Sequence, residues 1–404
     1  MPKVAMFVWN DFRNDARVLK EAETLQSAGY QVRVYALHTP GETSKFQTLS
    51  SGIEVSRTLR TPFWYLRKRT RTPSIANNQT GVISSISRGK LLLMSLARLW
   101  THLTTATKII LFNPHVVHSH DVNTLPTCWL ATLLSRARLV YDAHEISTSR
   151  EGYSSVKKLV SLVESFLMPK AMGTITTTDE RAKFFARAYG IPRPVVLQNR
   201  PRLQSAERQS DLIRETLKLK EPWPIILYQG GLQQGRGLER LVRVAASVEN
   251  AYFVFIGGGR LEEPLKAIAA SLQLEEKVFF IPTVPLEELL SYTASASIGV
   301  QPIENTCLNH FSTDSNKLFE YLIAGLPVVA SDLPEIRKVV NQGQVGLLVP
   351  EGDSDALAEA LQHLVDNSEI CEQFRNASGA AAEYFCWEEQ ESKLNTLYAR
   401  VLKK

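Results

Sequence analysis

Cysteine is scarce in this 404-residue sequence, and its scarcity argues against two kinds of site. The four cysteines are Cys128, Cys307, Cys371 and Cys386, and no two of them form a CxxC pair. Neither a disulfide framework nor a zinc centre is therefore expected, and reduced thiols fit a cytosolic protein.

Long hydrophobic runs are lacking as well. The first run, in MPKVAMFVWN, has about six apolar residues, which is short for a signal peptide and suits a buried strand. A later stretch around Leu91–Leu99 is broken by Ser95 and Arg98, whereas a membrane-spanning helix needs about 20 apolar residues. We therefore expect a cytoplasmic protein, and contact with the inner face of the membrane remains an alternative.

A strong charge imbalance is also missing. The chain has 46 basic and 41 acidic residues, a net charge of +5. This balance is far from the footprint of a nucleic-acid-binding protein, so no nucleic acid partner is expected. A slightly positive chain suits an enzyme whose ligands are phosphorylated or whose surface meets anionic lipid.

Short apolar runs alternate with helical patterns along the whole chain. The strands expected in the first half are Val4–Trp9, Gln31–Ala36, Ile53–Thr58, Val116–Ser119, Leu139–Asp142, Gly173–Thr177 and Val195–Gln198. Those expected in the second half are Pro224–Tyr228, Tyr252–Ile256, Val278–Ile281, Ser297–Gln301, Pro327–Ala330 and Gly346–Val349. Apolar strands that alternate with helices indicate parallel sheets, so the sequence predicts an α/β protein with two doubly wound domains.

The predicted domain boundary lies in the polar, proline-rich segment 199–223. We expect domains at residues 1–200 and 201–387 and an amphipathic C-terminal helix at 388–404. A basic and aromatic insertion is expected at about 57–111, with six basic residues around three aromatic ones: Arg57, Arg60, Arg67, Lys68, Arg69 and Arg71 around Phe63, Trp64 and Tyr65. This segment either meets an anionic membrane or is a solvated charge run.

Two glycine loops follow predicted strands. Tyr228–Gly237 has four glycines in eight residues and leads into a helix, with Arg236 as a cation near the helix start. Glycines let backbone amides approach a ligand, and a helix N-terminus favours an anion, so this loop is either a diphosphate cradle or a flexible turn. The second loop, Phe255–Arg260, is a weaker signal of the same kind.

A second element of the expected anion site is the segment Ser312–Gly325. A helix should begin near Asn316, with Asp314 or Ser315 as the N-cap. Lys317 is then unfavourable for the helix dipole unless an anion lies there, and Glu320 is one turn further on. The pair either binds a phosphate and a ribose or forms a surface ion pair.

Histidines and acids gather at the ends of two predicted strands. The first strand ends in Val117–Asp121, with His118 and His120, and the second in Tyr141–Glu145, with His144. The carboxyl ends of neighbouring parallel strands lie at one edge of a sheet, which predicts a catalytic site or a metal site there.

These segments together resemble the retaining glycosyltransferases of family four. The run NKLFEYLIAGLPVVASDLPEIRKVV resembles the donor-site signature of that family, YQGGLQQGRGLE its phosphate loop, HSHD its histidine motif and DARVLKEAETLQSAGYQV its first helix. The resemblance implies the GT-B architecture, with two Rossmann-like domains whose parallel sheets face a central cleft. It also implies a C-terminal helix that crosses back to the N-terminal domain.

The resemblance further implies a retaining, metal-independent hexosyltransferase that uses a nucleotide sugar. The donor would be a UDP- or GDP-sugar and the acceptor a glycan or a lipid-linked molecule in polysaccharide or glycoconjugate synthesis, with no metal or other cofactor and with membrane contact as an option. The residues carried over as catalytic are His118, His120, Arg236 and Lys317. Those carried over to the donor site are Gly230, Gly231, Arg236, Gly257, Thr283, Val284, Asn316, Lys317, Leu318 and Glu320. Those on the acceptor side are Asn14, Arg17, Asp121, His144 and Glu145.

Two positions depart from the family pattern. Ser312 stands where the family often has a glutamate, and Gly231 stands where it usually has an arginine. The first loop, Asn10–Arg17, also lacks the usual pair of glycines. A nucleotide-sugar-binding protein without catalysis is therefore a second hypothesis. A nicotinamide oxidoreductase is a third, but it would need a GxGxxG after the first strand, and Trp9–Asp15 has no glycine.

Overall fold

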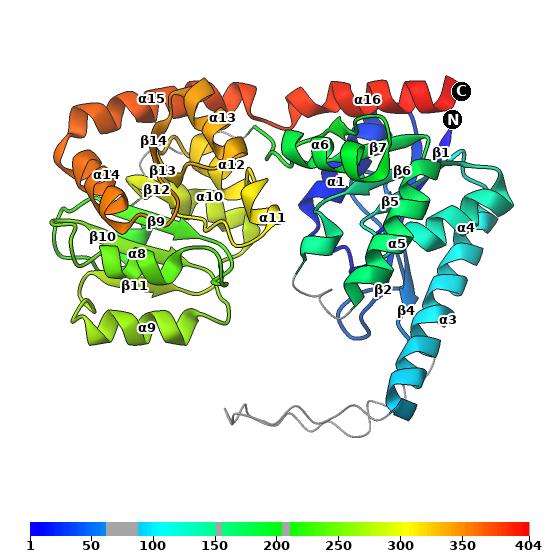
Figure 1. The fold of residues 1–404 in the computed structure, drawn as a ribbon, viewed down its shortest axis with the longest axis horizontal. Coiled ribbons are helices and arrows are strands. Elements are labelled where there is room, and N and C mark those ends of the chain that lie inside the picture. Colours follow the sequence, from blue (N-terminus) through cyan, green and yellow to red (C-terminus); the bar gives the residue numbers. More distant parts are fainter. Residues whose placement is uncertain (62–87, 151–155, 204–210, 404) are drawn as a thin grey trace. The chain divides into compact units, whose positions relative to one another are not determined.

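The computed structural model describes residues 1–61, 88–150, 156–203 and 211–403 (Figure 1). The chain divides into two compact units. The N-terminal unit comprises residues 1–177, 182–196 and 391–404, and the C-terminal unit comprises residues 178–181 and 197–390. This clustering divides the chain near residues 196 and 390, beside the predicted boundaries at 200 and 387.

The sheet of the N-terminal unit has eight strands among the described residues, in the order β3-β4-β2-β1-β5-β6-β7-β8. All neighbours pair in parallel except β3, which pairs antiparallel with β4. The strands are β1 Lys3–Phe7, β2 Gln31–His38, β3 Phe46–Thr48, β4 Glu54–Leu59, β5 Val116–His120, β6 Arg138–Ala143, β7 Gly173–Thr176 and β8 Val195–Val196. From β4 to β7 this is the strand order of dinucleotide-binding folds, with its switch point between β1 and β5.

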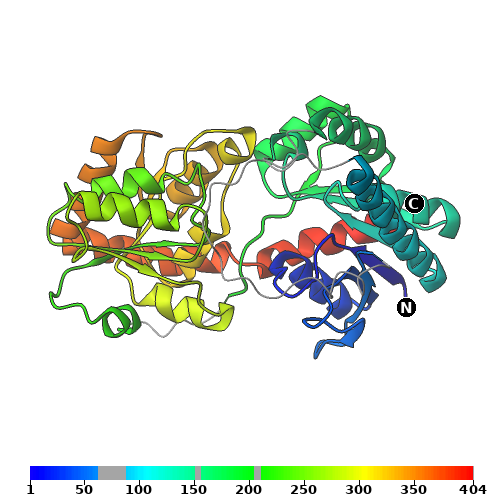
Figure 2. The same cartoon turned by 90° about the horizontal axis from the view of Figure 1, so that it is seen from below.

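Helices cover both faces of this sheet (Figures 1 and 2). They are α1 Ala16–Ser27, α3 Arg88–Phe112, α4 Leu125–Ser135, α5 Lys157–Leu167, α6 Asp179–Tyr189, the short turns η2 Ser147–Ser149 and η4 Met168–Lys170, and α16 Glu388–Lys403. Helix α1 is capped by Asp15, whose side chain accepts a 3.2 Å hydrogen bond from the Val18 amide. It is followed by Gly29 at φ +89°, the left-handed conformation that ends many helices.

The sheet of the C-terminal unit has six described strands, all parallel, in the order β11-β10-β9-β12-β13-β14. They are β9 Ile225–Gln229, β10 Tyr252–Ile256, β11 Val278–Ile281, β12 Ile298–Gln301, β13 Val328–Ser331 and β14 Gly346–Val349. This is again the dinucleotide-binding order, and the switch point lies between β9 and β12. Ligands bind at the carboxyl ends of the strands beside such a point. The loop after β9 is therefore the expected position of a ligand in this unit.

Two hydrophobic clusters pack on the two faces of this second sheet. Ile225 and Leu227 of β9 belong to one cluster and Ile226 and Tyr228 to the other, as alternation along a strand requires. The first cluster includes side chains of α10 Leu286–Ala294, α12 Asn316–Ile323, α13 Pro334–Gly343 and α15 Ser368–Tyr384. The second includes those of α8 Leu238–Val244, α9 Glu262–Ser271 and α14 Ser354–Asp366. The remaining helices are α7 Leu212–Leu217 and α11 Leu308–Phe311.

The predicted α/β alternation is confirmed strand by strand, with ends that differ by one or two residues. The interpretation of Arg57 as part of a basic insertion is wrong, because Arg57 lies in β4 and is 3% exposed. Its guanidinium donates to the carbonyls of Asp11 and Ser44 and to the side chain of Gln47. Residues 62–87 of the predicted insertion, which include Phe63, Trp64 and Tyr65, lie outside the described residues.

Candidate active site

The loop after β9 is crossed by the side chain of Lys317. Gly230 has φ +116°, and a Cβ atom there would lie 2.2 Å from the Lys317 Cε. The backbone conformation favours glycine at this position, and a side chain here would displace the end of the Lys317 side chain. The structure therefore brings together two residues, 87 positions apart, that the sequence assigned to one anion site.

The two glycine loops also pack against each other. A Cβ at Gly257, where φ is +138°, would lie 2.2 Å from the carbonyl oxygen of Gly230, and one at Gly259 would lie 2.2 Å from that of Leu232. The Leu232 amide donates to the Gly258 carbonyl. Close packing of loops thus accounts for glycine at position 257, whose contact with a donor stays a prediction.

Lys317 is a half-buried cation. Burial, followed by repulsion from Arg236, lowers its pKa to about 8, and the charge of Glu320 offsets only part of this shift. No ion pair of Lys317 or Arg236 is found within the described part of the chain. The alternative of a surface ion pair between Lys317 and Glu320 is therefore not what the structure has. Two cations without an ion-pair partner among the described residues, beside a glycine loop, are what an anion site needs, and binding of an anion there stays a prediction.

Glu320 is held by a hydrogen-bonded chain that starts in α10. Thr293 donates from its hydroxyl to the Gln229 side-chain oxygen over 2.7 Å, and Gln229 donates from its amide nitrogen to Glu320 Oε2 over 2.6 Å. Gln229 and Thr293 are buried, whereas Glu320 is partly exposed. This series of hydrogen bonds uses Oε2 of Glu320 and leaves Oε1 for a ligand. A carboxylate fixed in this way can bind a ribose diol.

The N-terminus of α12 differs from the expectation in one respect. Ser315 is the N-cap residue, with φ 33°, but its side chain makes no capping hydrogen bond. Asp314, the other candidate, is buried and accepts from the Gln198 side chain over 2.8 Å. Asn316 is exposed in the first turn, while Leu318 packs its side chain in the core and donates its amide to the Ser315 carbonyl.

The remaining predicted donor residues lie at neighbouring strand ends. Thr283 is exposed and Val284 is partly buried in the loop after β11, beside Gly258, whose Cβ would lie 3.5 Å from the Thr283 hydroxyl. Gly231 is exposed on the loop after β9. All three stand at the carboxyl edge of the sheet, where the parallel strands place their ligands.

Ser312, which replaces the usual glutamate, is part of the interior. It is 2% exposed, donates from its hydroxyl to the Leu308 carbonyl over 2.6 Å and accepts from Arg181 Nε over 3.2 Å. Arg181 also donates to the Asn309 carbonyl. The Ser312 side chain therefore helps to hold α11 in place. The chain has no glutamate carboxylate at this position.

The second cluster is built around Asp142 in the N-terminal unit. Arg17 of α1 binds this carboxylate with two hydrogen bonds, of 2.8 and 3.0 Å, and its Nε lies 3.1 Å from Glu21 Oε1. Burial opposes ionisation of Asp142, but the charges of Arg17 and His144 outweigh burial and keep its pKa well below the ordinary value. Glu21 is different, because burial and the charge of Asp142 raise its pKa well above the ordinary value.

His118 is locked inside this cluster. It is fully buried, its Nδ1 shares a 2.9 Å hydrogen bond with the Tyr398 hydroxyl of α16, and its Nε2 lies 3.8 Å from Glu21 Oε2. Burial and the neighbouring His120 lower its pKa well below 6.5, so the ring is neutral. Such surroundings are those of a structural histidine.

His120 ends β5 and stacks on His118, with ring centroids 4.2 Å apart. Its Nδ1 lies 3.2 Å from His144 Nε2 and 3.5 Å from Asp142 Oδ2, and its Nε2 has no hydrogen-bond partner among the described residues. Burial lowers its pKa. Burial also opposes the charged form of His144, but Asp121 and Asp142 outweigh it and raise the pKa of His144 to about 9. His120 is thus a neutral donor or acceptor backed by a charged pair.

The other predicted acceptor-side residues are more exposed. Asp121 has φ 62° and pairs with Arg150 at 3.2 Å, and Arg150 also lies 3.3 Å from Glu145. Asn14 is exposed just before α1. Arg17, by contrast, is 4% exposed and binds Asp142 inside the cluster. Its predicted role on the acceptor side can therefore only be indirect.

The geometry could also suit a cation, since one ligand atom each from Glu21, His118, His120 and Asp142 lies within 4.8 Å of the others. Arg17, however, already uses both oxygens of Asp142. A second cation there would repel the guanidinium, and we therefore assign the position of positive charge in this cluster to Arg17.

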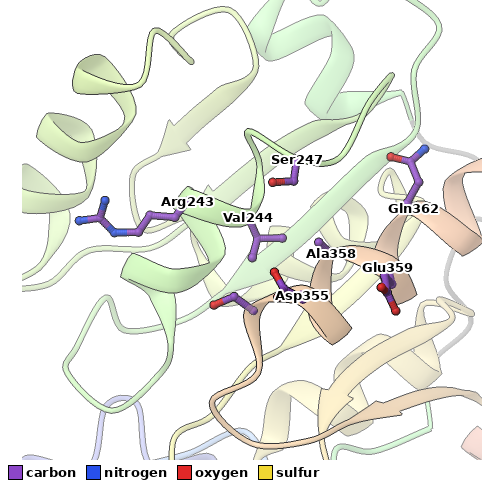
Figure 3. A pocket seen from close by; sticks show the side chains of 8 residues that line it. Arg243, Val244, Ser247, Asp355, Ala358, Glu359 and Gln362 are labelled. Carbon is purple, nitrogen blue, oxygen red and sulfur yellow. The ribbon is translucent and has the colours of Figure 1, made fainter.

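Figure 3 shows a hollow of about 530 Å³ between α8 and α14. It is lined by Arg243, Val244, Ser247, Ser354, Asp355, Ala358, Glu359 and Gln362. None of these residues belongs to either cluster described above, so the hollow is not part of the candidate site.

Two family models match the chain and together span most of it. Residues 15–200 match the glycosyl transferase 4-like domain, and residues 209–380 match the glycosyl transferases group 1 family. The chain therefore belongs to the group 1 glycosyltransferases of the family-4-like type and is a glycosyltransferase. Its fold is GT-B.

Curated relatives agree with this assignment. The chain is 27% identical over 302 residues to phosphatidyl-myo-inositol mannosyltransferase of Mycobacterium leprae, a match over 71% of this chain and 73% of the relative. It is 24% identical over 304 residues to D-inositol 3-phosphate glycosyltransferase of Corynebacterium diphtheriae, over 70% of each chain.

Solved structures share the fold along the whole chain. Sucrose-phosphate synthase from Thermosynechococcus elongatus superposes with a TM-score of 0.79 at 18% identity, covering 100% of both chains. HepE of Anabaena in complex with UDP superposes with a TM-score of 0.73 at 15% identity, covering 99% of this chain and 100% of that one. Within the described residues, no helix is both long and apolar enough to span a membrane.

Sequence reasoning missed several residues that shape the two clusters. Gln229 lies in the glycine loop Tyr228–Gly237. A polar residue at the end of an otherwise apolar strand could have indicated that it belongs to the site. Glu21 is one turn after Arg17 on α1, a spacing that also could have been used. Thr293 and Tyr398 gave no signal, because their contacts lie 64 and 280 residues away in the sequence.

Proposed function

We propose that this chain is a retaining, metal-independent hexosyltransferase that moves a sugar from a UDP- or GDP-sugar to a glycan or lipid-linked acceptor. The observation that carries the proposal is the pair of cations, Lys317 and Arg236, that flank the glycine loop after β9 without an acidic partner in the described chain. The UDP complex of the structurally similar HepE supports a uridine donor, and the mannosyltransferase relative supports a lipid-linked acceptor. Synthesis of polysaccharides or glycoconjugates is the corresponding process, at the cytoplasmic side of a membrane.

In the proposed chemistry, the residues around Lys317 and the residues around Asp142 have different roles. Lys317 and Arg236 stabilise the charge that develops on the departing diphosphate, and Glu320, held by Gln229, binds the ribose. Retention follows if the departing phosphate takes the acceptor proton on the face that it leaves. His120 then supplies a hydrogen bond to the transferred sugar and does not itself attack the anomeric carbon.

A panel of nucleotide sugars tests the proposed function. We expect one UDP- or GDP-sugar to release its nucleoside diphosphate with the purified chain, by slow hydrolysis or by transfer to an added acceptor, with the α or β configuration kept. Ser312 and Gly231 favour the second candidate, a protein that binds a nucleotide sugar without turning it over. Tight binding of a donor with no turnover on any acceptor would support that candidate and contradict ours.

Nucleotide binding should weaken as the pH rises through the pKa of Lys317. The pKa is about 8, lowered by burial and by Arg236, and the phosphate site needs the charged lysine. The affinity for a nucleoside diphosphate should therefore fall about tenfold between about pH 7 and pH 9, as the protonated fraction of the lysine falls. Calorimetric titration measures this slope, and Lys317→Arg, which stays charged over this range, should flatten it. An equally steep slope in the arginine variant would contradict the assignment.

Activity should survive removal of divalent metal. Lys317 and Arg236 supply the positive charge that a metal would otherwise bring to the diphosphate, and Arg17 supplies it in the Asp142 cluster. We expect turnover with a chelator such as EDTA to equal that without it. Loss of turnover on chelation, with recovery on added magnesium or manganese, would contradict metal independence and point to Glu21, His118, His120 and Asp142 as ligands.

A further inference from the structure

Three helices of the N-terminal unit expose an unusual amount of apolar surface. Twelve of the 22 large hydrophobic side chains that are exposed in the described chain lie on α3, α4 and α5, so the exposed apolar surface is concentrated there. Four of the exposed leucines on α3, Leu92, Leu96, Leu99 and Leu103, recur at the spacing of one helical face, and Leu93 and Leu111 of this helix are exposed as well. On α5 they are joined by Leu159, Leu162 and Phe166, which also share a face.

The two faces meet in one groove. Its volume is about 710 Å³, and its walls include Met94, Leu99 and Leu103 of α3, Pro126 of α4, and Leu159 and Val163 of α5. Figure 1 shows that the first half of α3 projects past the sheet. Contiguous apolar surface of this kind marks an interaction site.

The exposed charged side chains on α5 and on the short turn η4 after it are basic. Lys157 and Lys158 begin the exposed part of α5, and the Lys170 ammonium lies 4.3 Å from the centre of the Phe166 ring. The three helices contain a single acidic residue, Glu164, which is fully buried and accepts hydrogen bonds from Tyr141, Ser147 and Tyr189. The helices therefore offer leucines and lysines to a partner, and no exposed carboxylate.

We propose that the α3–α5 face docks on an anionic lipid bilayer, with its leucines in the interface and its lysines on the headgroups. Amphipathic helices with basic polar residues bind membranes in this way. Charge disfavours a second copy of the chain as the occupant, because two identical basic faces repel each other. The inference deepens the proposed membrane-side function but is independent of the donor chemistry, and it places the contact on described helices outside the basic segment 57–71.

Sedimentation with vesicles tests the proposal on the full chain. We expect binding to phosphatidylcholine vesicles that contain phosphatidylglycerol, little binding to phosphatidylcholine alone, and release by salt. Leu162→Glu should weaken binding about tenfold or more, on the scale of one leucine withdrawn from an apolar phase. Lys157→Gln and Lys158→Gln should each weaken it about fivefold at low salt.

A matched control is Leu286→Glu on α10, because Leu286 is 65% exposed and Leu162 is 66% exposed. This control should bind vesicles like the unchanged chain, and all the variants should still bind a nucleoside diphosphate. That second readout separates failure of this proposal from failure of the proposed function. Equal binding to neutral and anionic vesicles, binding to neither, or an equally large loss in both leucine variants would overturn the proposal. So would a dimer in sedimentation velocity that Leu162→Glu dissociates, since a second copy would then cover the face.

Discussion

Replacing Lys317 or Arg236 with alanine is expected to lower turnover by roughly a hundredfold or more. The reason is that each cation stabilises the charge that appears on the leaving diphosphate, and removal of one such preorganised group costs about this much in other enzymes. The measurement is the rate of nucleoside diphosphate release at saturating donor.

Controls for this prediction lie on neighbouring helices. Arg243 is an exposed arginine further along α8, and Lys266 is an exposed lysine of α9 that pairs with Glu262 at 2.9 Å. Alanine at either position should leave turnover within about twofold, as is usual for surface substitutions. If Lys317→Ala and Arg236→Ala kept near-normal rates as well, the donor site would be misplaced.

Removing the Nε2 nitrogen of His120 should have an effect of similar size. His120 Nε2 has no partner in the described structure, whereas Nδ1 faces His144 over 3.2 Å. His120→Asn can keep an amide near the place of Nδ1, and His120→Gln can bring one near the place of Nε2. We expect turnover to fall roughly a hundredfold in the asparagine variant, on the scale of one lost transition-state hydrogen bond, and clearly less in the glutamine variant.

The neighbouring His118 provides the contrast. Its Nδ1 is bound to Tyr398, and it is fully buried, so Tyr398→Phe should cost stability of about 1 kcal/mol, typical of one lost hydrogen bond, with little loss of turnover. Thermal unfolding and turnover measured together separate the two roles. Loss of turnover in Tyr398→Phe with normal activity in His120→Asn would reverse the assignment of the two histidines.

Local patterns in the sequence were enough to predict the two parallel sheets and the glycine loop beside Lys317. The strand Tyr252–Ile256, for example, is a continuous apolar run that ends at a glycine loop, and this local pattern is enough to predict it. The same holds for the end at Gly325 of the helix that carries Lys317 and Glu320, whereas the predicted capping hydrogen bond at its start does not form.

Long-range contacts set the limit of such predictions. Arg57 fell both in the expected strand Ile53–Thr58 and in the predicted basic insertion, and acceptors from three separate positions let its guanidinium be buried in β4. The choice between His118 and His120 depends on Tyr398, which is 280 residues further along the chain. Sequence spacing carries no information on such a contact.

The nucleotide is expected to bind to the C-terminal unit, through the loop after β9 and the start of α12. Calorimetric titration of UDP and of GDP into the full chain and its variants tests this claim most directly. We expect Lys317→Ala and Glu320→Ala to weaken binding of the preferred nucleotide at least about tenfold, as loss of a charged contact does. His120→Asn should bind it as the unchanged chain does. A folded His120→Asn variant that lost nucleotide binding as severely as Lys317→Ala would contradict the account.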